Sequence, residues 1–370
     1  MLRILFSFLL VILLFAQSAC SQKIIGNTSV EPIRGTWITN VGSEILSSRD
    51  SIKAGIDLCK KNGLNHIFVV VWNQGATVYP SDVTQRYVGV SQNKRYIGRD
   101  PLKEVIEEAH AQNIKVHAWF EFGFSYAYKD SNSIWLQKYP SWAGRNNKGA
   151  LLQKNGFFWW SSIRPDVQQM LQELVQEVVS NYEIDGVQGD DRMPAMPGEG
   201  GYDEYTVALY KKEHNGQLPS QQPFDAAWIQ WKADKLSKFG KHLYQSVKKI
   251  KPTCIVSWAP SIYPWSKEQY LQDWPTWLKE GYADYIFPQM YRYNIKAYEQ
   301  LLVDLDKQVP AHLKSKVYPG ILTSLGAGYQ SNRALTDQMI NLNRKYGYQG
   351  EVFFYFETLH RLSGGIYSLL

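Results

Sequence analysis

Short apolar segments with the character of β-strands recur along this 370-residue chain, and helix-like segments separate most of them. The segment His66–Trp72 (HIFVVVW) is almost wholly apolar, as is typical of a parallel strand that is covered on both faces. The segment after it opens with Asp100 as a helix N-cap and Pro101 at the first helical position. The eight strand-like segments are Arg34–Val41, His66–Trp72, Lys115–Gly123, Ile184–Asp191, Cys254–Ser261, Tyr282–Arg292, Lys316–Ser324 and Gly350–Thr358.

This alternation predicts an α/β fold, because each parallel strand needs a crossover connection to the next one. Eight βα units over roughly 330 residues indicate a (β/α)8 TIM barrel with enlarged βα loops. A doubly wound sheet is the rival architecture. It would contain fewer strands and would usually have a glycine-rich turn after the first, which the sequence WITNVGSE does not supply.

The N-terminal segment has the form of an export signal. Residues 1–20 (MLRILFSFLLVILLFAQSAC) carry one positive charge, then an apolar run, then small residues that end in Cys20. We expect a lipoprotein-type signal at 1–20 with lipidation at Cys20, a tether at 21–32 and the barrel at 33–370. A plain cleaved signal and a membrane anchor are the alternatives. The expected location is exported, in the cell envelope, with membrane contact through the N-terminal lipid only.

Charge and composition limit the kinds of ligand that the chain is expected to bind. The net charge is +6, and the basic residues are spread along the chain, so no nucleic-acid-binding stripe is expected. The 13 Trp, 24 Tyr and 15 Phe suit either sugar binding or a tryptophan-rich core. Two further cysteines, Cys59 and Cys254, are either buried thiols or one disulfide, and they form no metal motif. We expect no cofactor and no metal.

In a TIM barrel the active site lies at the carboxyl ends of the strands. The predicted strand ends are rich in carboxylates, amides and aromatic rings. Glycoside hydrolysis needs these groups, since a carboxylic acid protonates the leaving oxygen, a carboxylate acts on the sugar, and rings stack on it. The predicted catalytic residues are Asp190, Asp191, Glu121 and Glu357. The predicted substrate-binding residues are Trp37, Asn40, Trp72, Asn73, Trp119, Gln188, Arg192, Trp258, Gln289, Tyr291 and Tyr355.

The adjacent carboxylates Asp190 and Asp191 end one predicted strand, in the sequence IDGVQGDDR. Strand alternation places Asp190 toward the barrel mouth, and we favour it as the ionised group. Asp191 is then either the acid or the group that positions Arg192. The alternative is a turn-capping pair bound to Arg192. An ion pair with an arginine is also the alternative for Glu121. Metal binding by the two aspartates lacks a recognisable third ligand.

Several motifs together resemble one known family. They are RGTWITNV, HAWFEFGF, YEIDGVQGDDRMP, GYDEYTVALYKKEHNGQLP, SWAPS, YLQDWPTWLKEGYADYIFPQMYR and YPGILTSLG. Over nearly the whole chain after residue 20, the sequence resembles the glycosyl hydrolase-like 10 family. The resemblance implies a TIM-barrel hydrolase of the cell envelope that acts on peptidoglycan glycan strands lacking stem peptides. It also implies an acidic site of Glu121, Asp190 and Asp191, with Gln289 and Tyr291 beside them.

The chain departs from the family pattern at two places. Gly189 replaces a bulky residue before the aspartate pair, and Ala259-Pro260-Ser261 replaces a segment that usually reads SPN. These departures concern the substrate subsite more than the reaction. The chitinase-type motif D-G-x-D-x-D-x-E does not fit, because Gln188 and Arg192 stand at two of its acidic positions. A glycosidase for another polysaccharide and a non-catalytic glycan-binding barrel remain as alternatives.

Overall fold

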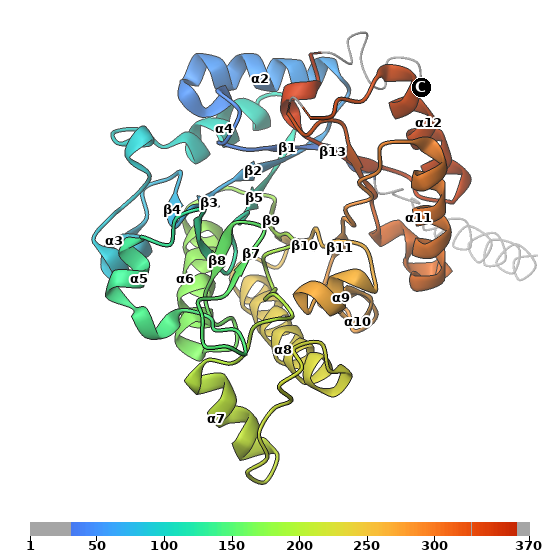
Figure 1. Ribbon diagram of the computed structural model, residues 1–370. Coiled ribbons are helices and arrows are strands. Elements are labelled where there is room, and N and C mark those ends of the chain that lie inside the picture. The colour runs from blue at the N-terminus through green and yellow to red at the C-terminus, as the bar shows by residue number, and fades with distance from the viewer. Residues whose placement is uncertain (1–30, 327, 361–370) are drawn as a thin grey trace, which may run out of the picture. The chain divides into compact units, whose positions relative to one another are not determined.

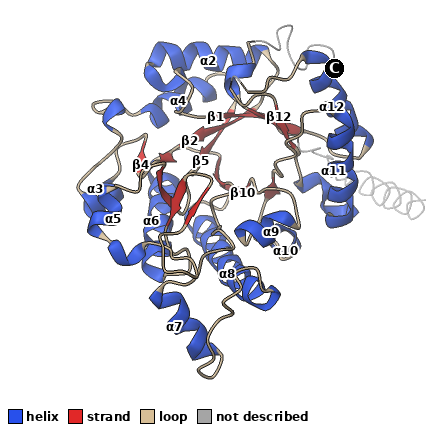
Figure 2. Cartoon of the chain, in the orientation of Figure 1, coloured by secondary structure: helices blue, strands red, loops and turns tan. Residues whose placement is uncertain are grey.

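The computed structural model describes residues 31–326 and 328–360. The expected signal at residues 1–20, the lipidation site Cys20 and most of the expected tether at 21–32 lie outside these ranges. Eight parallel strands form one curled sheet (Figures 1 and 2). They are β1 (Arg34–Ile38), β2 (His66–Val70), β5 (Lys115–Trp119), β9 (Gly186–Gly189), β10 (Ile255–Trp258), β11 (Tyr285–Ile286), β12 (Gly320–Leu322) and β13 (Glu351–Phe354). Neighbours in this sheet follow chain order, and the predicted TIM-barrel class is confirmed.

The two edges of the sheet, β11 and β12, are joined by single parallel bridges rather than by a full ladder. Ile286 pairs with Val317, and Gln289 pairs with Gly320. The predicted strands here were longer, at Tyr282–Arg292 and Lys316–Ser324. Both contain a proline, Pro288 or Pro319, next to the regular strand. Because proline has no N–H for the ladder, pairing at this seam is interrupted.

Helices cover the outside of the barrel (Figure 2). The predicted start of the helix after β2 is confirmed, since the Asp100 side chain accepts a hydrogen bond from the Lys103 backbone N–H and Pro101 follows it. No helix in the described ranges has the length and apolarity needed to cross a membrane. The helices that follow the strands are α2 (Arg49–Lys61), α4 (Pro101–His110), α6 (Pro165–Asn181), α8 (Ala226–Ile250), α10 (Trp274–Lys279), α11 (Ile295–Gln308) and α12 (Arg333–Lys345).

The loops after β2, β5, β9 and β10 are enlarged and carry elements of their own. A buried lysine of α8, Lys232, holds the loop after β9 in place. Its ammonium donates hydrogen bonds to the carbonyls of Gly198 at 2.6 Å and Gly200 at 2.9 Å. The added elements are β3 (Trp72–Asn73), β4 (Ala76–Thr77), α3 (Asp82–Val88), β6 (Ser125–Tyr128), α5 (Ile134–Lys138), β7 (Gln153–Lys154), β8 (Phe157–Trp159), α7 (Glu204–Glu213) and α9 (Trp265–Tyr270).

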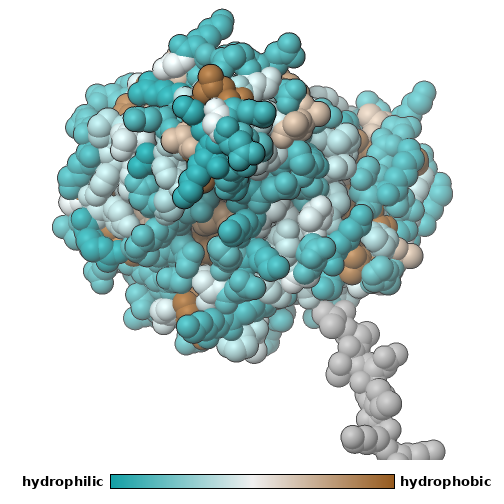
Figure 3. All heavy atoms as spheres, turned by 90° about the horizontal axis from the view of Figure 1, so that it is seen from below, coloured by the Kyte–Doolittle hydropathy of each residue, from teal (hydrophilic) through white to brown (hydrophobic). Residues whose placement is uncertain are grey.

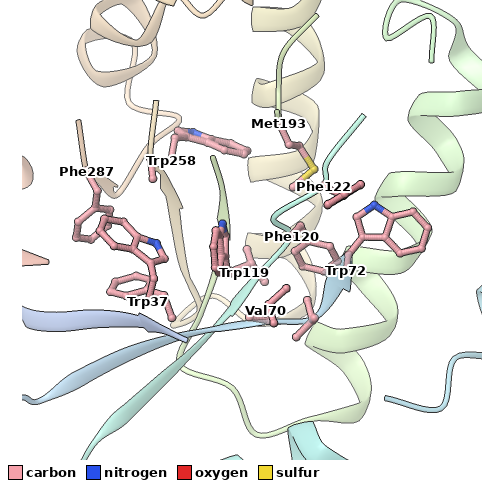
Figure 4. Packing of buried hydrophobic residues seen from close by; sticks show 14 of the residues in the cluster. Trp37, Val70, Trp72, Trp119, Phe120, Phe122, Met193, Trp258 and Phe287 are labelled. Carbon is pink, nitrogen blue, oxygen red and sulfur yellow. The ribbon is translucent and has the colours of Figure 1, made fainter. Parts of the chain in front are cut away.

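Most of the aromatic surplus is core. Of the 13 tryptophans, only Trp231 and Trp265 are not buried. Figure 4 shows several of these rings gathered around the strand ends. Both Cys59 and Cys254 are free and buried thiols. The surface face in Figure 3 is largely hydrophilic, with apolar side chains in small separate patches. The tryptophan surplus is therefore mainly a feature of the core.

Candidate active site

A cavity of about 220 Å³ opens at the carboxyl ends of the barrel strands. It collects side chains that are far apart in sequence, because parallel strands deliver their ends to the same face of a barrel. Trp119 and Phe354 end β5 and β13, and Asp190 and Ala259 directly follow β9 and β10. The lining residues are Trp37, Trp119, Glu121, Asp190, Asp191, Arg192, Ala259, Gln289, Tyr291, Leu325 and Phe354.

Arg192 lies between the three carboxylates that line this cavity. Its Nη2 lies 2.8 Å from Asp190 Oδ2 and 3.7 Å from Glu121 Oε1, and its Nη1 lies 3.1 Å from Asp191 Oδ1. The carboxylates raise the pKa of the Arg192 guanidinium even though burial disfavours its charge. Among the described residues no three acidic, histidine or cysteine side chains are placed to bind a metal ion together. The guanidinium supplies the positive charge between the three acids.

Asp190 is the most enclosed of the three carboxylates. Its Oδ1 accepts from the Arg192 backbone N–H at 2.9 Å, and its Oδ2 accepts from the Arg192 guanidinium. Its own backbone carbonyl accepts from the Gln272 side chain at 2.7 Å. Burial raises the pKa of Asp190 well above its usual range, and Arg192 acts against that rise. Both carboxyl oxygens are thus already bound, so this group is fixed in place.

Glu121 follows β5 and is held by an amide on the neighbouring loop. Asn73 Nδ2 donates to Glu121 Oε2 at 2.5 Å. Burial raises the pKa of Glu121, while Arg192 and the Asn73 hydrogen bond lower it and Asp191 raises it further. The net direction is upward. Glu121 is therefore an acid whose pKa lies above its ordinary value and whose side chain, 17% exposed, can still reach a ligand.

Asp191 is the most open of the three. Its side chain is 23% exposed, against 3% for Asp190 and 17% for Glu121. Among the described residues, its ion-pair partner is the Arg192 guanidinium, 3.1 Å away. Three acids within reach of one arginine thus occupy different surroundings. Such a difference is what separates acid and base roles in one site.

Arg192 is held between backbone and aromatic rings. Its Nε donates to the Glu121 carbonyl at 2.6 Å, and its guanidinium lies 4.7 Å from the ring centre of Phe157 and 5.9 Å from that of Phe122. Phe157 comes from β8, inside a segment expected only as a long loop. The apolar run Phe157–Trp160 (FFWW) was the signal that this loop contains a strand.

Amide side chains orient the rings of the cavity. Trp37 Nε1 donates to Gln188 Oε1 at 2.7 Å, and Gln188 Nε2 donates to Ser257 Oγ at 3.2 Å. Gln188 is itself buried, so it acts through Trp37 rather than on a ligand. Gln289 lines the cavity and donates to the Ala259 carbonyl at 3.0 Å. These contacts fix the side chains that face the cavity.

Tyr291 presents a phenol to the same cavity. Its ring centre lies 5.5 Å from that of Phe354. Burial raises the pKa of Tyr291 well above its usual range, and the charges of Asp191 and Asp190 add to the rise. The phenol therefore stays neutral and is a hydrogen-bond donor beside the acids. Ala259, from the segment that departs from the family pattern, also lines the cavity. Phe354 and Leu325 line it too but were not singled out from the sequence, because an apolar side chain at a strand end carries no chemical signal.

Two predicted sugar-binding tryptophans lie in the core instead. Trp72 is fully buried, donates to the Gly123 carbonyl at 3.1 Å and packs on Trp135. Trp258 is 1% exposed and packs on Trp277. Neither ring has a free face for a sugar, so both are corrected to structural residues.

Three other predicted residues lie outside the cavity. Glu357 accepts a short hydrogen bond from Ser43 and lines a separate hollow. The Tyr355 hydroxyl lies 3.5 Å from the Gly42 carbonyl, toward the same hollow. Asn40 does not line the cavity either, and its Oδ1 is buried without a partner. The chain turns away from the mouth after Phe354, in the 3-10 turn Phe356–Thr358, and this turn separates Glu357 from the three acids.

Comparison with known proteins identifies relatives of most of the chain. The family model for Glycosyl hydrolase-like 10 matches residues 32–337. The chain is 25% identical to glycosyl hydrolase YngK of Bacillus subtilis (strain 168), with 76% of this chain and 59% of YngK covered. It is 25% identical to glycosyl hydrolase DigH of Escherichia coli (strain K12), with 71% and 66% covered. The chain therefore spans less than two thirds of the length of these curated relatives.

Solved structures with the same fold include two carbohydrate-active proteins. The glycoside hydrolase domain of PgaB (BpsB) from Bordetella bronchiseptica superposes with a TM-score of 0.66 at 15% identity, covering 89% of this chain and 96% of that one. The catalytic domain of β-amylase from Paenibacillus polymyxa gives a TM-score of 0.62 at 12% identity, covering 88% and 93%. At such identities the likeness shows a shared fold.

Proposed function

The chain belongs to the glycosyl hydrolase-like 10 family, and from this membership we propose that it is a glycoside hydrolase that cleaves glycosidic bonds by acid and carboxylate catalysis. The observation that carries the proposal is the cluster of Glu121, Asp190 and Asp191 around Arg192 in the cavity at the barrel mouth. The three carboxyl groups differ in burial and in partners. Glycoside hydrolysis requires two carboxyl groups with different protonation states.

The surroundings of each acid assign the roles. Glu121, whose pKa burial raises, donates a proton to the leaving glycosidic oxygen. Asp191, open and paired with Arg192, acts as the carboxylate, either by attack on the anomeric carbon or through a water molecule. Asp190 has both oxygens occupied and positions Arg192. The sequence favoured Asp190 as the ionised group, and the proposal moves that role to Asp191.

The finer part of the proposal concerns the substrate. We take it to be the glycan strand of peptidoglycan that lacks stem peptides, in the cell envelope. The N-terminal export pattern and the motif resemblance support this choice. The small, aromatic-walled cavity also suits a bare sugar chain. Lipid anchoring through Cys20 belongs to the same proposal.

One observation favours a second candidate function, a non-catalytic glycan-binding barrel. Arg192 lies within ion-pair distance of all three carboxylates, so it offsets much of their charge. In a binding protein these ion pairs would serve to shape the cavity. The unequal exposure of the acids still favours catalysis, because ion pairs alone would not require one carboxylate to face the cavity.

A comparison of cleavage with binding tests the proposal. Residues 21–370 would be incubated with amidase-stripped glycan strands and with intact peptidoglycan, and released sugars would be measured by mass spectrometry. We expect short sugars from the stripped strands, at least about a hundredfold less with Asp191→Asn, and no loss with Asp50→Asn, an exposed aspartate on α2. Co-sedimentation with the glycan should persist in Asp191→Asn.

Two results would count against it. Binding by all three proteins with no sugar released from either substrate would establish the glycan-binding barrel. Equal release by the wild type and Asp191→Asn would remove Asp191 from the mechanism. Release from a different soluble polysaccharide, but not from peptidoglycan strands, would keep the chemistry and overturn the substrate.

A further inference from the structure

Exposed aromatic rings in the described part of the chain are restricted to one end of the barrel. Tyr128, Phe224, Trp265 and Tyr293 are the aromatic residues among its exposed large hydrophobic side chains, with exposures from 41% to 59%. Each lies on a loop between a barrel strand and the helix that follows it. This is the end that carries the acid cavity. The asymmetry indicates that aromatic surface is kept exposed beside the cavity for contact with a ligand.

Tyr293 is the most exposed of these rings, at 59%, and it lies next to the cavity. Two residues before it, Tyr291 lines the cavity wall. Its partner is Tyr329, whose ring centre is 4.7 Å away with the two planes inclined by 50°. Tyr329 is tied to the cavity as well, because its backbone carbonyl accepts a hydrogen bond from the backbone N–H of cavity residue Leu325 at 2.8 Å.

In the Tyr293–Tyr329 pair, Tyr329 offers its ring surface rather than its hydroxyl group. The Tyr329 hydroxyl is buried with no hydrogen-bond partner among the described residues, although the residue as a whole is half-buried. Its ring is thus inserted with the polar end inward. Leu325, 48% exposed, continues the apolar surface toward the cavity. A strip of ring and aliphatic surface therefore runs from the acids to the tyrosine pair.

Tyr291 and Phe354 extend the same strip inside the cavity, with ring centres 5.5 Å apart, and Phe354 lies 6.1 Å from Trp37. Aromatic faces match the CH-rich faces of pyranose rings, and polar groups at their edges bind hydroxyls. Arg292, between Tyr291 and Tyr293, is half-buried and donates to the Tyr291 carbonyl at 2.7 Å.

We infer that Tyr293 and Tyr329 form a distal sugar subsite, on which a glycan unit beyond the cleavage cavity stacks. This inference rests on the proposed function and deepens it. The substrate is then a chain that extends out of the cavity across Leu325, and affinity depends on chain length. A disaccharide confined to the cavity does not reach the pair, whereas a longer chain does.

Binding measurements on a proton-donor variant test this subsite without turnover. In the Glu121→Gln background, dissociation constants would be measured by calorimetry for chitin oligosaccharides of two and six sugar units. Adding Tyr293→Ala should weaken binding of the hexamer about three- to tenfold and leave the dimer unchanged. Tyr293→Phe should retain the affinity, because the ring is kept. Tyr346→Ala, at the end of α12 on the opposite end of the barrel, is the matched control.

The outcomes separate this inference from the proposed function. Equal weakening for dimer and hexamer, or no weakening, would overturn the subsite. A concentration-dependent dimer of the protein that Tyr293→Ala abolishes in sedimentation would also overturn it, since the pair would then cover a second copy. If the hexamer binds through Tyr293 but the parent protein cleaves no glycan, the subsite stands and the proposed hydrolysis fails.

Discussion

Asp190, Asp191 and Glu121 all lie within ion-pair distance of the Arg192 guanidinium, but their contacts with it differ. Asp190 takes both a backbone and a side-chain hydrogen bond, whereas Asp191 has a single ion pair and Glu121 lies 3.7 Å from the guanidinium. Asp190, with both oxygens bound and its side chain 3% exposed, is held in place, whereas Glu121 and Asp191 are more exposed and can reach a ligand. These differences in contacts and exposure underlie the proposed roles.

The Asn73 side chain provides a test of the proton donor. Its hydrogen bond favours ionised Glu121, so Asn73→Ala should raise the pKa of Glu121 further. Activity needs the protonated form and is lost as the pH rises through this pKa. The alkaline limb of the pH–kcat profile should then move upward by roughly one pH unit. An unchanged limb in Asn73→Ala, with Asn40→Ala as the control outside the cavity, would contradict Glu121 as the acid.

At the residue scale, the expectation that a TIM-barrel site lies at the carboxyl ends of the strands identified the charged residues of the cavity. It placed Glu121, Asp190, Asp191 and Arg192 in one cavity from the sequence alone. It misplaced Trp72 and Trp258 because alternation along a strand does not show which neighbouring elements will cover a ring. Trp72 packs on Trp135 of the loop after β5 and Trp258 packs on Trp277 of α10, and no local pattern encodes this long-range packing.

At the element scale, the antiparallel sheet β6–β8–β7 supports the site by placing the Phe157 ring against Arg192. It lies in the loop after β5 and pairs Tyr128 with Phe157. Successive side chains of a strand point to opposite faces of the sheet, so the rings of Phe157 and Phe158 pack against different neighbours. Phe157 covers Arg192, and Phe158 packs toward Tyr126. The small sheet thus holds a ring against the cation that the three acids share.

The neighbouring phenylalanines make a matched pair of variants. Phe157→Ala removes the ring that lies 4.7 Å from the guanidinium, a contact of about 1.4 kcal/mol, so kcat should fall roughly tenfold. Phe158→Ala removes a half-buried ring of the same size from the other face and should leave kcat within a factor of about two. Steady-state kinetics measure kcat for both variants, and melting curves confirm that both are folded. Equal losses would show that β8 acts only through stability.

The elements themselves were predictable to different degrees. The N-cap of α4 and the eight strand positions follow from local chemistry, and the structure confirms them. The predicted strands at Tyr282–Arg292 and Lys316–Ser324 were longer than β11 and β12. The hydrophobic pattern continues past Pro288 and Pro319, whereas strand pairing is interrupted there because proline has no N–H to donate. The strands β7 and β8 were missed, since they are short and pair only within a loop.

At the scale of the whole molecule, barrel closure is what makes one site from many segments. The first and last strands, β1 and β13, pair directly, and this brings Trp37 and Phe354 to within 6.1 Å between ring centres. The family match extends from residue 32 to residue 337 and so covers the elements that carry the three acids. The site is a property of the closed barrel, and no single motif holds it.

The most direct measurement is hydrolysis in oxygen-18 water, followed by mass spectrometry of the products. Amidase-stripped glycan strands would be incubated with residues 21–370 and, separately, with the Glu121→Gln variant. If the protein hydrolyses glycosidic bonds, each new reducing end carries one oxygen-18, and the variant yields at least about a hundredfold less product. Glycan that binds to the protein but yields no labelled product would contradict the proposed glycosidase activity.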